Sequence, residues 1–189
     1  DAIVVPGADM RIYGEGGNDV ITTNYDFGAR GNYLDGGEGN DILTSYGNDL
    51  TTGYGYQGDV LKGGEGNDIL TSYGSVSALY GGGGVDTLFS GGGFSTPTKN
   101  RLFGGTGNDK LYESAGEHTS LYGGSGIDTL LSHGSGAVLF GGDGGDTITA
   151  YQMTTSSFCS LLSGDDGDDT LVARGDCSRL QGGSGSDKL

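Results

Sequence analysis

The chain repeats one short phrase nine times: two glycines, a variable residue, glycine, a variable residue, aspartate, a variable residue, then leucine or isoleucine. The fullest copies occupy residues 36–43 and 63–70. Every copy keeps the aspartate and the aliphatic residue two places later, and the nine aspartates are Asp19, Asp41, Asp68, Asp86, Asp109, Asp128, Asp146, Asp169 and Asp187. Self-similarity of this kind predicts a stack of identical structural units.

The spacing of the aspartates defines the unit. Successive motif aspartates lie between 18 residues (86 − 68) and 27 residues (68 − 41) apart. The minimum is two nonapeptides, so one turn should contain a glycine loop, a strand, a second loop and a second strand. Longer turns add residues to the second loop, as between Gly91 and Lys99 and between Tyr151 and Phe158. Insertions on one side only are what a solenoid tolerates.

Composition supports this fold and excludes several classes of protein. A length of 189 residues indicates one domain, residues 1–189. Glycine, at 43 residues, would suggest disorder if it were aperiodic, but a strict period indicates a repeat fold. There is no helical periodicity, no apolar run long enough for a membrane span and no basic-apolar signal segment. The fold class is therefore all-β, a parallel β-solenoid.

Two columns of aliphatic residues should form a thin core. The first column contains Ile21, Leu43, Leu70, Leu88, Leu111, Leu130, Ile148 and Leu171, and the facing column contains Ile12, Leu34, Leu61, Leu79, Leu102, Leu121, Leu139, Leu162 and Leu180. Such a core buries little apolar surface per residue, whereas ordering the backbone costs about 1–2 kcal/mol per residue. A further stabilising interaction is therefore expected.

The glycine loops supply the chemistry for that interaction. Glycine allows positive φ, which turns carbonyl oxygens inward, and the aspartate adds one carboxylate per turn. A mixture of carboxylate and carbonyl oxygens suits Ca²⁺, whereas the loops lack the His and Cys that zinc would need. Nine stacked loops have eight gaps, and eight calcium ions would carry a charge equal in magnitude to the net charge of −16.

The motif resembles the nonapeptide of the RTX (repeats-in-toxin) family, and the resemblance covers essentially the whole chain. It implies a right-handed parallel β-roll, calcium between the loops of adjacent turns, and a secreted protein. By position, the nine aspartates would be calcium ligands, and the loop glycines would supply carbonyl oxygens and tight turns. The glycines matched to the motif are Gly36, Gly37, Gly39, Gly63, Gly64, Gly66, Gly104, Gly105, Gly107, Gly123, Gly124 and Gly126.

The chain departs from the family pattern in two respects. Glu15 and Asp165 stand where the second glycine is expected, which predicts distorted sites in those loops. The second half of each turn lacks the Gly-Asp motif. Calcium should therefore form one row of about eight ions on one side of the roll.

Two smaller sets of residues repeat in the same frame. Cys159 and Cys177 each precede a core leucine by three residues, so they should stack in adjacent turns within the Cα range that a disulfide accepts. An outward column of aromatic residues follows the core aliphatic positions, and it consists of Tyr13, Tyr80, Phe103, Tyr122 and Phe140. It is either a ladder that stabilises the stack or a docking stripe for carbohydrate or protein.

Both ends of the chain lack a polar cap. Asp1 aligns with the motif aspartate of a turn without its glycine loop, and Leu189 is a motif core position. Uncapped solenoid ends favour either a segment cut from a longer repeat protein or head-to-tail stacking into a fibre.

The sequence as a whole predicts a calcium-stabilised extracellular structural element without enzymatic activity. No Ser/His/Asp set is implied, and the carboxylates are assigned to calcium. No nucleic-acid partner and no membrane span are expected of so acidic a chain. A carbohydrate-binding or adhesive module and an accessory roll of a larger secreted enzyme remain the alternatives.

Overall fold

The computed structural model describes residues 1–6, 9–24, 31–46, 58–91, 99–114, 116–151, 158–175 and 177–189, and within them every regular element is a β-strand. The inserted segments after Gly91 and after Tyr151 lie outside the described residues. Nine strands pair into one parallel sheet in the order β1 (Ala2–Val5), β3 (Val20–Thr23), β5 (Ile42–Ser45), β7 (Ile69–Ser72), β9 (Thr87–Ser90), β11 (Lys110–Glu113), β13 (Thr129–Ser132), β15 (Thr147–Tyr151) and β17 (Thr170–Arg174).

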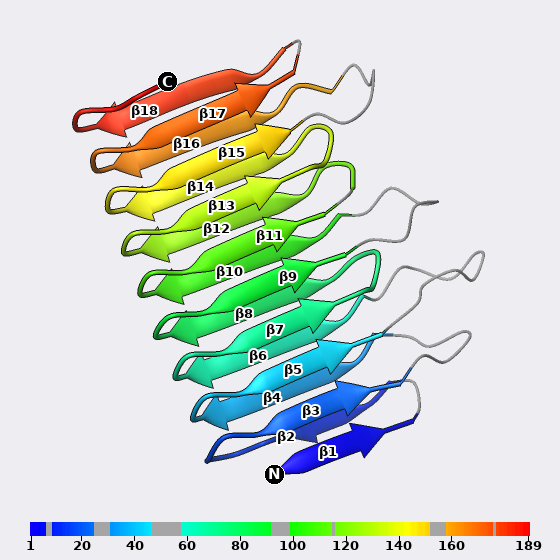
Figure 1. Cartoon of the computed structure of the whole chain (residues 1–189). Coiled ribbons are helices and arrows are strands. Elements are labelled where there is room, and N and C mark those ends of the chain that lie inside the picture. The colour runs from blue at the N-terminus through cyan, green and yellow to red at the C-terminus, as the bar shows by residue number, and fades with distance from the viewer. Residues whose placement is uncertain are drawn as a thin grey trace.

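The other nine strands form a second parallel sheet. Its strands, in chain order, are β2 (Arg11–Tyr13), β4 (Tyr33–Glu38), β6 (Val60–Glu65), β8 (Ala78–Gly83), β10 (Arg101–Thr106), β12 (Ser120–Ser125), β14 (Val138–Asp143), β16 (Leu161–Asp166) and β18 (Arg179–Ser184). The chain alternates between the sheets, so the two sheets face each other and the termini lie at opposite ends of the stack (Figure 1). This confirms the predicted β-solenoid.

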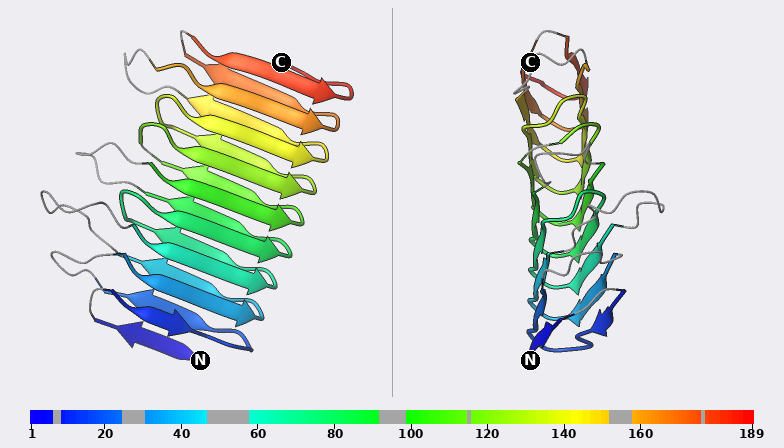
Figure 2. Two further views of the ribbon diagram at one scale, coloured as in Figure 1. Left: turned by 180° about the vertical axis from the view of Figure 1, so that it is seen from behind. Right: turned by 90° about the vertical axis from the view of Figure 1, so that its right-hand side faces the viewer.

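The core lies between the two sheets, which form a thin double layer when viewed along their edges (Figure 2). Strand register places Leu102 beside Leu79 and Leu121, and Leu111 beside Leu88 and Leu130. From Leu34 to Leu139 the aliphatic residues of both columns are fully buried. Full burial of one such side chain contributes roughly 1.5–3 kcal/mol, so both predicted columns are confirmed as the hydrophobic core.

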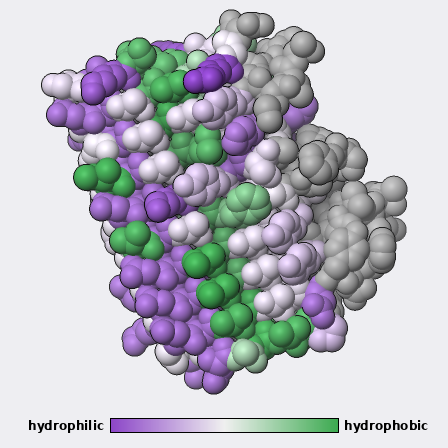
Figure 3. Space-filling model, viewed as in Figure 1, coloured by the Kyte–Doolittle hydropathy of each residue, from purple (hydrophilic) through white to green (hydrophobic). Residues whose placement is uncertain are grey.

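The outer faces of the sheets carry residues in register as well. On the sheet of odd-numbered strands, Val20, Ile42 and Ile69 are 41–46% exposed and lie in adjacent strands. Figure 3 shows an apolar stripe at the N-terminal end of this face and more polar residues beyond it. On the other sheet, the rings of Tyr80, Phe103, Tyr122 and Phe140 stack face to face at centroid distances of 4.9, 4.9 and 5.4 Å.

The aromatic column is therefore a ladder over four turns. Tyr13 does not belong to it, because its ring instead contacts Tyr33 at 5.7 Å. Within the described residues there is no helix long and apolar enough to cross a membrane.

Two edges join the sheets. Loops that lead from each even-numbered strand to the next odd-numbered strand carry the Gly-Asp motif, and we call this side the Gly-Asp edge. Loops from each odd-numbered strand to the next even-numbered strand form the opposite edge. Eight motif loops make the connection on the Gly-Asp edge, and the ninth follows β18 on the same side.

Candidate metal centre

The motif aspartates form one buried row along the Gly-Asp edge. Each motif aspartate from Asp19 to Asp169 is at most 2% exposed, and Asp187 in the last turn is partly exposed. Each aspartate from Asp19 to Asp169 directly precedes an odd-numbered strand, and its buried side chain is turned inward with the aliphatic core residue two places later. The sequence prediction of one carboxylate per turn, stacked in register, describes this arrangement.

One oxygen of each carboxylate is used to join adjacent turns. Asp68 Oδ1 accepts a hydrogen bond of 2.8 Å from the backbone amide of Asp41 in the preceding turn. Asp109 Oδ1 accepts in the same way from Asp86. The bond recurs between every pair of successive motif aspartates, at 2.7–3.1 Å.

The second oxygen has no such partner. Oδ2 is buried and without a hydrogen-bond partner among the described residues at Asp19, Asp41, Asp68, Asp86, Asp109, Asp128, Asp146 and Asp169. A buried carboxylate oxygen left unbonded costs free energy. Eight such atoms in one row indicate that a ligand completes them.

The first glycine of each motif is packed against Oδ2, with no room for a side chain. A Cβ on Gly63 would lie 2.6 Å from the carbonyl oxygen of Gly81 in the next turn and closer still to Asp68 Oδ2. Gly104 repeats this with the Gly123 carbonyl oxygen and Asp109 Oδ2. Gly36 and Gly123 occupy the same position in their loops, so this position excludes any side chain.

The second and third glycines of the motif hold the loop backbone at positive φ. The φ values of Gly64 and Gly66 are 115° and 136°. The equivalent glycines in the other matched loops, which are Gly37, Gly39, Gly105, Gly107, Gly124 and Gly126, have φ values of 103–132°. Glu15 and Asp165 replace the second glycine and still adopt positive φ, at 73° and 74°. These two loops therefore keep the same turn, with a smaller φ than the glycines have.

A second row of side chains secures the same loops from the other direction. Asn40 Oδ1 accepts from the amide of Asn67 in the next turn, and Asn67 Oδ1 accepts from the amide of Val85. Asn18, Asn108 and Asp168 make equivalent bonds. The motif aspartates accept hydrogen bonds from backbone amides of the preceding turn, and the residues of this second row accept them from the following turn. Each loop is therefore hydrogen-bonded to both neighbouring turns.

Burial raises the pKa values of the motif aspartates when no calcium is bound. Burial, reinforced by neighbouring aspartates, raises the pKa of Asp86 and Asp146 to about 7 and of Asp68 and Asp128 to about 6, against the backbone hydrogen bond that favours the charged form. The pKa values of Asp41, Asp109 and Asp169 are raised for the same leading reason. The metal-free row therefore resists full ionisation.

The donor set of this edge is made of oxygen only. In the described part of the chain no three His, Cys, Asp or Glu side chains come together, so a carboxylate cage is absent there. One carboxylate oxygen and carbonyl oxygens from two successive turns are a hard-cation set, and Ca²⁺ accepts six to eight such ligands at about 2.3–2.6 Å. These residues fit calcium.

The opposite edge is built differently. Asn32, Asp59 and Asn100 stand there in the position of the motif aspartate, and the amide of Asn32 donates to Asp59 Oδ1 at 2.8 Å. Here the place of the first glycine is held by Ser72, whose hydroxyl lies 2.7 Å from Ser77 Oγ and 3.4 Å from Asp59 Oδ2. A hydroxyl thus hydrogen-bonds the buried acid here, whereas glycine supplies no such partner on the Gly-Asp edge.

Asp59, like Glu113, is a buried acid outside the nine motif copies. It is 1% exposed, and burial raises its pKa against hydrogen bonds from Asn32, Ser45 and Ser72. Its sequence signal is its position two residues before the core residue Leu61, the same offset that relates Asp68 to Leu70. Without the glycines before it, that offset is too short a pattern to identify.

The predicted disulfide is present. Cys159 and Cys177 are bonded, with a Cα–Cα distance of 4.9 Å. The bond joins the loops before β16 and β18 on the opposite edge, so it links successive turns away from the aspartate row.

The chain was compared with known protein families, curated proteins and solved structures. The family described as RTX calcium-binding nonapeptide repeat (4 copies) matches residues 11–24, 28–53, 54–75, 78–97, 94–112 and 163–189, which is more than half of the chain. No curated protein and no solved structure matches this chain.

Proposed function

Because the chain belongs to the family of RTX calcium-binding nonapeptide repeats, we propose that residues 1–189 act as one calcium-stabilised structural domain outside the cell. Its work is to stay folded and rigid where calcium is plentiful, without catalysis. The observation that carries this proposal is the row of buried Oδ2 atoms that have no hydrogen-bond partner among the described residues.

Calcium would be held between successive turns. The aspartate Oδ2 atoms would bind it from one turn, and glycine carbonyl oxygens would bind it from that turn and the next. The bound ion supplies positive charge to a row that otherwise repels itself. Since a ligand that binds only the folded state stabilises it by mass action, calcium would add folding free energy to a thin core.

A single row of about eight ions follows from the contrast between the edges. No hydroxyl reaches Asp68 Oδ2, because Gly63 has no side chain. The residue equivalent to Gly63 beside Asp59 is Ser45, and Asp59 hydrogen-bonds both Ser45 and Ser72 of the next turn. An acid with hydroxyl partners of its own does not require an ion to complete it.

The test pairs two buried aspartates. Asp109→Asn keeps the Oδ1 acceptor on the Gly-Asp edge but removes the charge, and Asp59→Asn does the same on the opposite edge. Native mass spectrometry should count about eight calcium ions in the wild type, fewer in Asp109→Asn and the wild-type number in Asp59→Asn. Equal losses in both variants, or no bound calcium in the wild type, would refute the single row.

An extracellular setting is supported by the family and by the disulfide. Disulfides persist in oxidising compartments and are rare in the cytosol. Cys159 and Cys177 are both exposed, so a reducing environment would reach the bond.

The second candidate function is end-to-end assembly. A further turn of the same repeat can pair with the outer strands β1, β2 and β18, because each has a sheet neighbour on one side only, whereas Lys188 already bridges the outer edge of β17. Such a turn can come from the same polypeptide or from a second copy. Light scattering of residues 1–189 with and without calcium is the test, and a monomer at high concentration in millimolar calcium would contradict assembly.

The aromatic ladder is a poor platform for stacked sugars. Its rings lie face to face, with interplanar angles of 4–7°. The faces that a sugar ring would contact are therefore covered by neighbouring rings, and the ladder is better suited to stabilising the stack. A carbohydrate or adhesive role requires a different surface.

A further inference from the structure

Two exposed tyrosines stack on each other where the opposite edge begins. Tyr46 directly follows β5 and Tyr73 directly follows β7, and these strands pair in parallel register. The ring centroids lie 4.9 Å apart, and the interplanar angle is 12°. The Tyr73 backbone amide donates to the Ser45 carbonyl oxygen at 2.9 Å. The backbone therefore holds the two rings at the spacing of neighbouring strands, about 4.7–4.9 Å.

Among the described residues, the pair has no third tyrosine stacked against it. The turns on either side carry Asn24 and Gly91 at the same position. Phe89 contacts the Tyr73 ring edge-on at a centroid distance of 6.3 Å, but phenylalanine has no phenol that can give up a hydrogen atom. A radical formed on either Tyr46 or Tyr73 therefore has the other phenol as its stacked neighbour.

Both rings are open to an oxidant from solvent. The exposed fractions of Tyr46 and Tyr73 are 38% and 46%. In the aromatic ladder of the other sheet, by contrast, Phe103 lies between Tyr80 and Tyr122, with its centroid 4.9 Å from each ring. Within the described part of the chain, Tyr46 and Tyr73 are the one pair of tyrosines that stack face to face. Accessibility and direct contact of two phenols are thus combined at this place.

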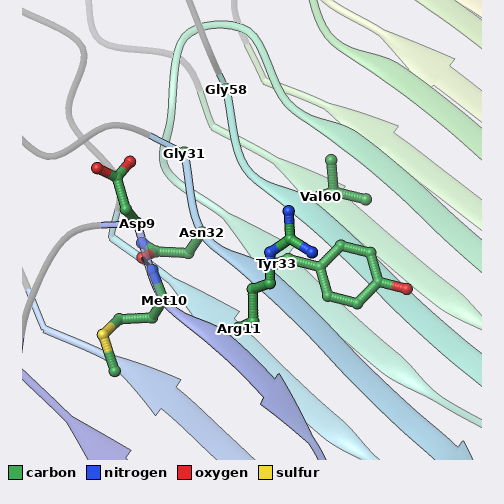
Figure 4. A pocket seen from close by; sticks show the side chains of 8 residues that line it. All are labelled: Asp9, Met10, Arg11, Gly31, Asn32, Tyr33, Gly58 and Val60. Atoms are coloured by element: carbon green, nitrogen blue, oxygen red, sulfur yellow. Dashed lines mark hydrogen bonds between the residues drawn. The ribbon is translucent and has the colours of Figure 1, made fainter.

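A second tyrosine pair, Tyr13 and Tyr33, is arranged differently. Its ring centroids are 5.7 Å apart, and the rings are tilted by 48°. Tyr33 lines a hollow at the start of β2, β4 and β6, between Arg11 and Val60 of the neighbouring strands (Figure 4). Its hydroxyl donates to Asp35 Oδ2 at 2.8 Å. These two rings are in contact without stacking, so they provide an internal comparison.

We propose that Tyr46 and Tyr73 form a modification site at which a peroxidase with hydrogen peroxide joins them as dityrosine and so staples two turns. Each phenol gives one electron and one proton to the oxidant. The two radicals combine in a bond between ring carbons next to the hydroxyl groups, and the hydrogens on those carbons move as protons to the phenol oxygens. The chain loses two hydrogen atoms, and one peroxide molecule is reduced to two water molecules.

The new bond would close the longest turn of the solenoid. Tyr46 and Tyr73 are 27 residues apart (73 − 46), which is also the longest spacing between successive motif aspartates. Cys159 and Cys177 already link adjacent turns on the same edge. The tyrosines would place a second covalent link of this kind nearer the other end of the stack. Such a link stabilises the fold by restricting the unfolded chain.

The experiment treats the dilute chain in calcium with peroxidase and hydrogen peroxide and maps the product by mass spectrometry. A monomeric product should appear that has lost two hydrogen atoms, shows dityrosine fluorescence and contains the Tyr46 and Tyr73 peptides joined. Its melting temperature should be roughly 5–10 °C above that of the untreated chain, because a cross-link that closes a loop of this length restricts the unfolded state.

Two conservative variants make the test specific. Tyr46→Phe keeps a ring in the stack but lacks the phenol, so the monomeric product and the rise in melting temperature should be lost. Tyr13→Phe removes one phenol from the tilted pair and should give the wild-type yield of the link between Tyr46 and Tyr73. The proposal is overturned if these two residues are not joined, if the joined chain melts no higher than the untreated chain, or if the two variants give equal yields.

Discussion

Asp86 and Asp109 are joined by a hydrogen bond of 2.8 Å in which the Asp86 backbone amide donates to Asp109 Oδ1. Asp109 in turn donates its amide to Asp128 Oδ1 at 2.8 Å. The fold thus uses one oxygen of each carboxylate to connect turns, while Oδ2 stays buried without a hydrogen bond in the described structure. This division of each carboxylate leads to the first two predictions.

Asp109→Asn should have opposite effects with and without calcium. Without calcium the amide keeps the Oδ1 acceptor and removes a buried charge that burial already disfavours, so the free energy of unfolding should be unchanged or higher. With calcium the variant loses a ligand, and leaving buried charges unpaired costs about 3–5 kcal/mol. Chemical denaturation in EGTA and in calcium measures both effects, and a loss of the same size in the two buffers would contradict the prediction.

Acid should stabilise the metal-free protein. The folded pKa values of Asp68, Asp86, Asp128 and Asp146, about 6 to 7, are above the ordinary value of 3.8. Between these limits the folded chain binds more protons than the unfolded chain, so stability rises as the pH falls from about 7 to about 4 and is lost as the pH rises again. In EGTA the melting temperature should be higher at pH 5 than at pH 8.

Calcium should reverse this dependence on pH. Protons compete with the ion for the same carboxylates, so the calcium-loaded chain should melt at a lower temperature at pH 5 than at pH 8. Parallel slopes with and without calcium would show that the aspartate row does not hold the ion.

Two glycines of the motif loops should differ sharply in their tolerance of alanine. Gly105 has a φ of 119°, and a Cβ there would overlap the Gly82 carbonyl oxygen. Gly105→Ala should therefore lower the free energy of unfolding by at least about 2 kcal/mol. Gly16 has no atom within 4 Å of its Cβ position and no positive φ, so Gly16→Ala should change it by less than about 1 kcal/mol. Thermal unfolding of both variants in calcium is the measurement, and similar losses would contradict the role assigned to turn stacking.

The disulfide should stabilise the calcium-loaded fold without affecting calcium binding. Cys159 and Cys177 close a loop with a sequence separation of 18, for which the chain-entropy model gives about 3 kcal/mol. The double variant Cys159→Ser/Cys177→Ser should lose about that much stability and keep the wild-type number of calcium ions. A loss of bound calcium would place the bond in the metal centre rather than on the opposite edge.

The repeat by itself determined most of the fold. Because the strands of a parallel stack pair in register, residues that share a place in the repeat must become neighbours, as Leu79, Leu102 and Leu121 do. The same rule brought Cys159 to Cys177 and placed the motif aspartates in one row. Periodicity fixes which residues stack, whatever their chemistry.

Only the tertiary structure decided how the stacked residues are used. The carboxylate of Asp68 has a bonded Oδ1 and an unbonded Oδ2, whereas Asp59 Oδ2 accepts a hydrogen bond from Ser72. Both arrangements depend on the packing of one turn on the next. Side-chain direction and burial are set by contacts between turns, and a repeat period carries no information about them.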